Sequence, residues 1–258
     1  MFGVLHRTPG LARAGIVLCP PYGEEMVASY THFTRWAKEL ARQGFVVFRY
    51  HPYGTGESEG EPRDFTLDSA KNDAIEAVHY LKNRVSLNCL GLFGLRFGGF
   101  VAAQAATICQ PDFLMLWSPV VQARQYCRDL LRLLLTKELV HQQTEQVRVT
   151  TQALVKELEG GRSVDIMGYE MSPEFYWQMS SNPPFPEAPP ASDLLWVMRP
   201  REATSAAAVV GNWKARGKNV EVRALDGPAF WEDWEFAFPE SFAGATSNWL
   251  TQKKMLGR

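Results

Sequence analysis

Residues 91–100 read Gly-Leu-Phe-Gly-Leu-Arg-Phe-Gly-Gly-Phe and join an apolar strand directly to a helix rich in small residues. Gly94, Gly98 and Gly99 lack a Cβ atom, so the backbone can turn sharply here and the helix can lie close to the sheet. Arg96 stands at the tip of this turn. Ligands of open α/β sheets bind beyond the carboxyl ends of the strands, so functional side chains are expected at this turn and at the equivalent ones.

Apolar runs and helical patterns alternate on both sides of the turn. Near-continuous apolar strands are typical of a parallel sheet that is covered by helices on both faces. The expected strands are 14–20, 44–51, 90–95, 113–119, 194–198 and 220–225. The expected helices are 28–43, 69–84, 99–109, 206–216 and 240–252. The sequence therefore predicts an α/β fold with a mostly parallel, doubly wound sheet.

The alternation stops in the middle of the chain. Residues 120–192 contain no strand-like run, show helical periodicity in RDLLRLLLTKELV and TTQALVKELEGG, and end in the proline-rich stretch NPPFPEAPP. We interpret them as a helical cap inserted into a core made of residues 1–119 and 193–258.

The composition excludes several classes of protein. Lys and Arg number 27, Asp and Glu number 28, and the net charge of −1 argues against a nucleic-acid-binding protein. No apolar run approaches the ~18 residues of a membrane span, and the amino-terminal residues do not resemble a signal peptide, so we expect a cytoplasmic protein. The four cysteines form no CxxC pair, and we expect no metal and no cofactor. A homodimer is one possible assembly of this chain, which the sequence leaves open.

Four features together resemble the α/β-hydrolase superfamily. They are the turn at 91–100, the segment CPPYGEE at 19–25, the segment RYHPYGTGES at 49–58, and the mid-chain helical stretch. The closest resemblance is to hydrolase-like proteins associated with bacterial exosortase and exopolysaccharide gene clusters. It implies an α/β-hydrolase fold with a cap domain and, by gene context alone, a role near surface-polysaccharide assembly.

The chain departs from this family at the catalytic triad. The resemblance places Arg96 at the nucleophile position of the G-x-S-x-G turn and Ala229 at the position of the histidine. A guanidinium cannot attack a carbonyl or act as a base, but it can hold a carboxylate or phosphate through paired hydrogen bonds. Glu202 is the only carboxylate near the acid position, and without a histidine it has nothing to orient. Hydrolysis by a Ser-His-Asp triad is therefore not expected.

Two interpretations of Arg96 remain open at the sequence level. Its guanidinium anchors an anionic or carbonyl group of a ligand, or it forms a structural ion pair with Glu24 or Glu25. The same two glutamates follow Tyr22 and Gly23, which are candidate ligand-binding residues, in the segment that corresponds by resemblance to the oxyanion loop of hydrolases. Either carboxylate could act as a general acid or base, or could neutralise Arg96 or cap a helix.

Other side chains at strand ends complete the candidate site. His51 is the only histidine at a carboxyl strand end, so it is a candidate for acid–base chemistry or a structural residue. Phe97, Ser118 and Trp231, with Trp234 beside it, are candidate ligand-binding residues or core residues. The literal G-x-S-x-G motif around Ser58 is followed by a proline instead of a helix, and we interpret it as a turn.

The sequence thus supports two hypotheses. In the first, the protein is an enzyme that acts on an acyl, ester or thioester-like ligand without a standard triad, with Arg96 as anchor and Glu24, Glu25 or His51 moving protons. In the second, it is a catalytically inactive pseudoenzyme that serves as a ligand-binding or accessory protein. In both, the partner is a small acyl or anionic molecule.

Overall fold

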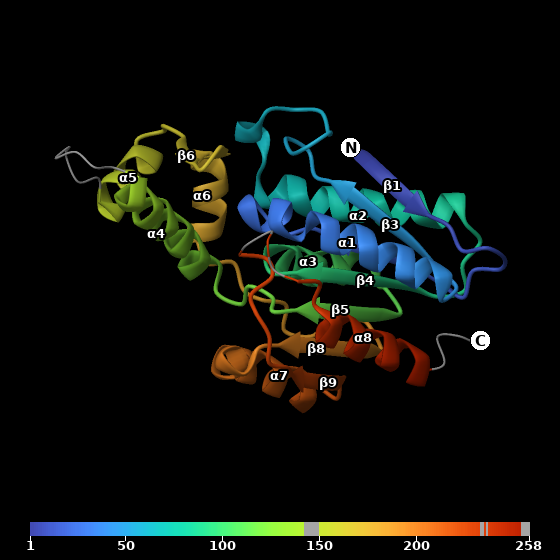
Figure 1. Cartoon of the computed structure of the whole chain (residues 1–258). Coiled ribbons are helices and arrows are strands. Elements are labelled where there is room, and N and C mark those ends of the chain that lie inside the picture. Colours follow the sequence, from blue (N-terminus) through green and yellow to red (C-terminus); the bar gives the residue numbers. More distant parts are fainter. Residues whose placement is uncertain (142–149, 233–234, 236, 254–258) are drawn as a thin grey trace.

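The computed structural model describes residues 1–141, 150–232, 235 and 237–253 (Figure 1). Its main sheet has seven strands in the order β1-β3-β2-β4-β5-β8-β9. All neighbouring strands are parallel except β1 and β3, which are antiparallel. The strands are β1 (Phe2–His6), β2 (Ala14–Cys19), β3 (Phe45–His51), β4 (Leu90–Leu95), β5 (Phe113–Trp117), β8 (Asp193–Met198) and β9 (Asn219–Ala224). The predicted α/β-hydrolase fold is confirmed.

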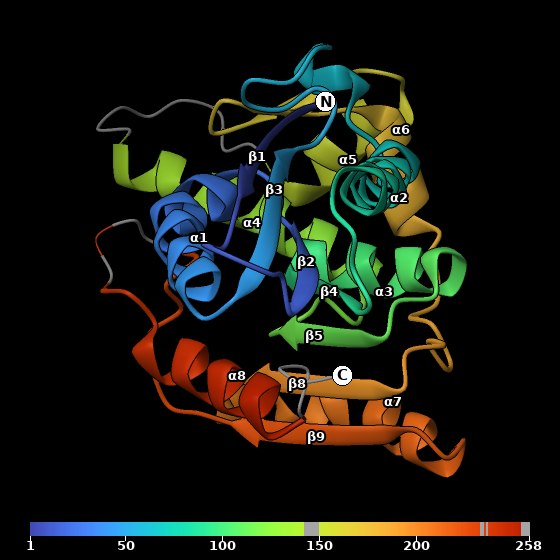
Figure 2. The same cartoon turned by 90° about the vertical axis from the view of Figure 1, so that its right-hand side faces the viewer.

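Helices cover both faces of this sheet (Figure 2). They are α1 (Glu24–Arg42), α2 (Leu67–Arg84), α3 (Phe97–Cys109), α7 (Ala203–Ala215) and α8 (Glu240–Gln252). Strand β4 shows how the two layers arise, because its successive side chains point to opposite faces. Leu92 packs in the cluster that includes α2, α3 and α7, whereas Phe93 and Leu95 pack in the cluster that includes α1 and α8.

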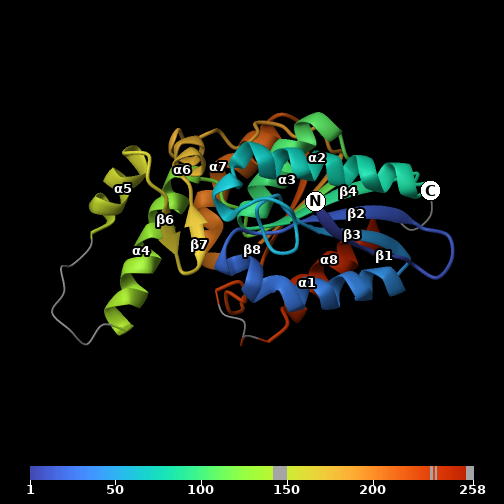
Figure 3. The same cartoon turned by 90° about the horizontal axis from the view of Figure 1, so that it is seen from above.

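The insertion between β5 and β8 gathers at one end of the sheet (Figures 1 and 3). It contains α4 (Ala123–His141), α5 (Thr151–Glu159), β6 (Val164–Ile166), β7 (Tyr169–Met171) and α6 (Pro173–Ser180). The prediction that this region has no strands is wrong, since β6 and β7 form a short antiparallel hairpin. Met167 and Gly168 make its two-residue turn at positive φ, and Asp165 accepts a hydrogen bond from the Gly168 amide at 2.8 Å. The cap boundaries at 120 and 192 stay a prediction.

Strand β1 is a second element that the sequence pattern did not reveal. It pairs with β3 at the edge of the sheet and none of its five residues is fully buried, so it lacks the continuous apolar run of the central strands. Among the described residues, none of the helices has the length and apolar character that crossing a membrane would require.

Candidate functional site

The turn between β4 and α3, which we call the elbow, holds Arg96 in an uncommon backbone conformation. Arg96 has φ 53°, in the left-handed region, and is the N-cap of α3. Such geometry costs about 1–3 kcal/mol for a residue other than glycine. Gly98 permits the close approach of α3 to the loop after β2, because a Cβ there would overlap the carbonyl oxygens of Cys19 and Pro20. The elbow therefore projects Arg96 beyond the carboxyl end of β4.

The Arg96 guanidinium forms an ion pair with Glu25. Its Nε donates to Glu25 Oε1 at 2.9 Å, and its Nη1 donates to the Ser118 carbonyl oxygen at 3.3 Å. The Tyr126 hydroxyl, from cap helix α4, donates to Glu25 Oε2 at 2.9 Å. Of the two pairings that the sequence left open, the structure thus shows the one with Glu25.

This three-residue cluster is largely shielded from solvent. The side chain of Arg96 is 23% exposed and that of Glu25 is 13% exposed. Burial alone would lower the pKa of Arg96, but the Glu25 carboxylate outweighs it and raises that pKa. Burial and the same carboxylate raise the pKa of Tyr126, which stays a protonated donor. Arg96 is therefore a permanent cation whose charge is balanced by Glu25.

A cavity of about 250 Å³ lies over the elbow, between the core and the cap. Four aliphatic or thioether side chains, two from α4, one from β6 and one from the residue after β6, give it an apolar roof, and Gly23 and Glu24 line its other side. Its lining residues are Tyr22, Gly23, Glu24, Glu25, Arg96, Tyr126, Asp129, Leu130, Leu133, Ile166, Met167, Tyr169, Trp231 and Glu232. The size is near the lower end of small-molecule sites, which typically span about 300–1,000 Å³.

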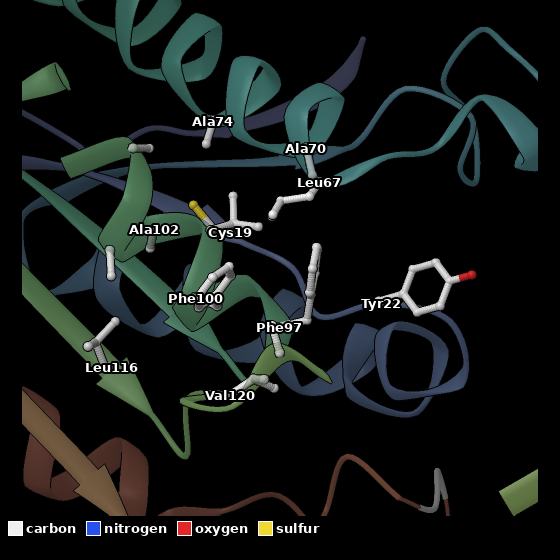
Figure 4. Close-up of a cluster of buried hydrophobic side chains, with 14 of the residues drawn as sticks. Cys19, Tyr22, Leu67, Ala70, Ala74, Phe97, Phe100, Ala102, Leu116 and Val120 are labelled. Atoms are coloured by element: carbon white, nitrogen blue, oxygen red, sulfur yellow. The ribbon is translucent and has the colours of Figure 1, made fainter. Parts of the chain in front are cut away.

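Tyr22 and Phe97 belong to a cluster of aromatic rings next to the elbow. The Tyr22 ring lies 4.9 Å from the ring of Phe65 and 4.7 Å from that of Phe175, while its hydroxyl is 3.5 Å from the Glu170 carbonyl oxygen. Figure 4 shows the Tyr22 hydroxyl pointing away from the apolar cluster that contains Phe97. The side chain of Phe97 is almost completely buried and does not line the cavity. The structure therefore gives its ring a packing position.

A second ion pair lies just after β8, where the resemblance led us to expect the acid of a triad. The Arg199 guanidinium donates to Glu202 Oε1 from Nε at 3.0 Å and from Nη2 at 2.8 Å. It also lies 4.5 Å from the ring of Trp231, and Arg96 lies 5.5 Å from the same ring. Trp231 is fully buried, and its Nε1 has no hydrogen-bond partner in the part of the chain that the structure describes.

Sequence reasoning did not predict Tyr126 as a residue of the candidate site, nor the pairing of Arg199 with Glu202. The spacing of Arg199 three residues before Glu202 was a usable signal for the ion pair. Trp234, the other tryptophan predicted here, lies outside the described residues.

The structure places His51 apart from this cluster. His51 Nδ1 accepts a hydrogen bond from the Glu57 amide at 3.0 Å, and it lines neither of the cavities that Arg96 lines. Burial and then Arg49 lower the pKa of His51. The Ser58 hydroxyl donates to the His51 carbonyl and accepts from the Phe2 amide at 2.8 Å. Both side chains thus hold the loop after β3, as predicted for Ser58.

The fold and the elbow define an α/β hydrolase. The chain belongs to the family described as serine aminopeptidase, S33, whose model matches residues 11–167.

The chain is also similar to transferases. It is 28% identical over 185 residues to polyketide transferase claH of Penicillium crustosum, covering 67% of this chain and 59% of that protein. It is 29% identical over 102 residues to an acyl transferase of Photobacterium leiognathi, covering 39% of this chain and 32% of the relative. The chain thus spans less than two thirds of the length of either relative.

Solved structures show the same fold. Est1E of Butyrivibrio proteoclasticus with bound ferulic acid has a TM-score of 0.65 at 14% identity, covering 97% of this chain and 94% of that one. A monoacylglycerol lipase of Paleococcus ferrophilus has a TM-score of 0.62 at 16% identity, covering 97% and 98%.

Proposed function

We propose that this protein binds a small neutral acyl ligand, an ester or thioester, and does not hydrolyse it by the serine route. In this proposal the acyl carbonyl accepts hydrogen bonds from Arg96, and the acyl chain lies in the 250 Å³ cavity beneath the cap. The observation that carries the proposal is the Arg96–Glu25 ion pair at the position where a hydrolase has its nucleophile.

Charge decides between a carbonyl and an anion as the group that Arg96 holds. Four carboxylates line the cavity, from Glu24, Glu25, Asp129 and Glu232, against the single guanidinium of Arg96. Neighbouring arginines outside the cavity approach Asp129 and Glu232, which leaves no surplus of positive charge. A carboxylate or phosphate would be repelled, whereas a neutral carbonyl oxygen accepts a hydrogen bond from a guanidinium without adding charge.

The positions of the histidines argue against hydrolysis. His6 accepts from Arg49, His32 packs against Phe230, and His51 accepts from Glu57. None of the described histidines lines the cavity. Both oxygens of Glu25 already accept hydrogen bonds, so the carboxylate nearest to Arg96 is poorly placed to take a further proton from an attacking group.

The relatives support an acyl ligand. One is named an acyl transferase and another a polyketide transferase. The resemblance to exosortase-associated proteins would place such a binding protein beside surface-polysaccharide assembly. In that setting it would act as an accessory protein that carries or senses an acyl compound.

Binding is tested with methyl octanoate and octanoate, which share a chain and differ in charge. We expect methyl octanoate to raise the melting temperature of the protein more than octanoate does at equal concentration. Arg96→Met should abolish the shift, while Arg216→Met, which removes an exposed guanidinium at the C-cap of α7 paired with Glu187, should preserve it. Equal shifts for Arg96→Met and the wild type would refute the proposal.

Hydrolysis is tested with p-nitrophenyl octanoate. We expect no release of p-nitrophenol above the buffer rate. Turnover that is lost in Arg96→Ala or His51→Ala would instead establish the enzyme hypothesis, with His51 reached by a rearrangement of its loop.

A further inference from the structure

Strand β9 is the last strand on one side of the main sheet, and its outer edge pairs with no other strand in the part of the chain that the structure describes (Figure 2). Proteins usually protect such an edge with a lysine, a proline or a bulge, because its free N–H and C=O groups can pair with another chain. The sequence of β9, NVEVRA, contains neither lysine nor proline, and all six residues keep a regular register with β8. Strand β9 therefore presents a regular, open edge.

One hydrogen bond shows which backbone groups face this open edge. The Leu225 amide, directly after β9, donates to the Met198 carbonyl oxygen of β8 at 2.8 Å. Alternate residues of a strand direct their N–H and C=O groups to opposite sides. The odd-numbered residues of β9 therefore bond to β8, whereas Val220, Val222 and Ala224 direct their N–H and C=O groups outward. A further strand would bond to these three residues.

The side chains of β9 divide between the two faces of the sheet. Val220 and Val222 pack in the core cluster that includes α7. Glu221 and Arg223 point to the opposite face, where Arg223 Nε and Nη2 donate to Glu221 Oε1 at 2.9 and 2.6 Å. Their side chains are half-exposed. The edge strand therefore carries an anion and a cation, two residues apart, on one face.

These two charges fit a second copy of the same strand in one antiparallel register. Directly opposite residues of an antiparallel pair have their side chains on the same face. With Val222 opposite Val222 of the second copy, Glu221 lies opposite Arg223, and Arg223 lies opposite Glu221. Moving the centre by one residue places Glu221 against Glu221 or Arg223 against Arg223, and like charges directly opposite are destabilising. The charges thus favour the register centred on Val222.

The same register also uses the whole open edge. It places Val220 opposite Ala224 of the second copy, so each of the three outward-facing residues meets another outward-facing residue. Helix α7, which packs on Val220, leaves room for this approach because its exposed surface includes several small residues. They are Ser205, Ala207, Ala208, Gly211 and Ala215. Each copy contributes the same patch, so the contact closes as a two-fold dimer and does not extend into a filament.

We propose that two copies of this chain form a symmetric dimer by antiparallel pairing of β9 with β9, centred on Val222. The pairing joins the two seven-stranded sheets into one. The occupant of the open edge is a second copy because Glu221 and Arg223 complement themselves under two-fold symmetry. The inference is independent of the ligand proposed above.

Sedimentation velocity over a wide range of protein concentration tests this inference. We expect the wild type to shift, as concentration rises, from the mass of one chain to twice that mass. Glu221→Arg and Arg223→Glu should each weaken the dimer at least about tenfold, because each places like charges opposite each other at two symmetric positions. Arg162→Glu, which reverses an exposed charge of the insertion paired with Glu157, should leave the dimer unchanged.

A mixture of the two charge variants tests the register. The Glu221→Arg strand carries two cations and the Arg223→Glu strand carries two anions, so a mixed pair has opposite charges facing each other at both positions. We expect the mixture to form a dimer at concentrations where each variant alone is a monomer. Such a rescue also shows that both variants are folded.

Val222→Pro tests the backbone pairing itself. The Val222 N–H faces outward, so proline removes no hydrogen bond to β8 but prevents pairing with another strand. We expect this variant to stay monomeric at every concentration, and the mixed charge variants keep the test decisive if it fails to fold. The inference is overturned by a wild type that stays monomeric, by a dimer that survives Val222→Pro, or by charge variants that do not associate when mixed.

Discussion

Replacing Glu25 by glutamine tests how the elbow tolerates a buried cation. Glu25→Gln preserves the size of the side chain and can still accept from Arg96, but it removes the balancing negative charge. The hydroxyl of Tyr126, which now donates to the second oxygen, must then accept from an amide instead. The guanidinium keeps its proton at any accessible pH, so its charge stays unbalanced.

The expected loss of stability follows from the burial of this pair. Breaking a fully buried ion pair by removing one partner costs about 3–5 kcal/mol. Arg96 and Glu25 are 23% and 13% exposed, and glutamine retains hydrogen bonds, so we expect about 2 kcal/mol. For a chain of this size that loss lowers the melting temperature by roughly 4–8 °C.

A double-mutant cycle with Arg96→Met separates charge from packing. We expect Glu25→Gln to destabilise the Arg96→Met protein far less than the wild type, with a coupling of at least about 1 kcal/mol by urea denaturation. In parallel, Glu25→Gln should shift ligand preference from methyl octanoate towards octanoate by about tenfold. Additive effects on stability together with an unchanged preference would refute the view that Glu25 balances Arg96.

Three other substitutions test the elbow and the histidines separately. Arg96→Ser should leave p-nitrophenyl octanoate hydrolysis at the buffer rate, because restoring the hydroxyl supplies no base; measurable turnover would contradict this. Gly98→Ala should lower the free energy of unfolding, measured in urea, by about 1–3 kcal/mol, because the added Cβ overlaps the loop after β2. The control Gly211→Ala should not lower it, because its Cβ would meet nothing within 4 Å. Burial and Arg49 hold the pKa of His6 below its usual 6.5. The neutral imidazole therefore stabilises the folded protein fully above pH 6.5, and this stabilisation is lost as the pH falls through the lowered pKa. His6→Gln, which can still accept from Arg49, should therefore flatten the fall of melting temperature below pH 6.5, and an unchanged slope would argue against this role.

The sheet was predictable because its strands are buried on both faces. Every residue of β2, β4 and β5 is buried, which leaves the continuous apolar runs that mark such strands. Strand β1 lies at the edge and hairpin strands β6 and β7 have three residues each, so neither has a comparable pattern. Met167 also hides the hairpin turn, since a turn with positive φ usually shows glycine, asparagine or aspartate.

The site was predictable only where one turn places its residue directly. Arg96 is located by the glycines of the elbow, and no other element is needed. Its partner depends on where α1 begins, which is Glu24 and not the predicted Ala28. Tyr126 depends on how the cap docks against the core, a long-range arrangement that local sequence does not encode. The position of His51 followed from the strand pattern, but the contacts of its ring come from the loop that folds over it.

The contacts of Arg96 indicate that no single substitution would build a serine triad at this elbow. A serine at the elbow would leave Glu25 without its cation, so the carboxylate would face the cavity with only the Tyr126 hydroxyl to bind it. A histidine at Ala229 would have to enter a buried position, and the Glu202 carboxylate meant to orient it is already held by Arg199. Each of these substitutions is unfavourable unless the others are made with it. An unpaired buried charge is more costly than either the present ion pairs or a complete triad. In the function proposed above, the two ion pairs would therefore stabilise a ligand-binding site at an elbow that has the backbone geometry of a hydrolase.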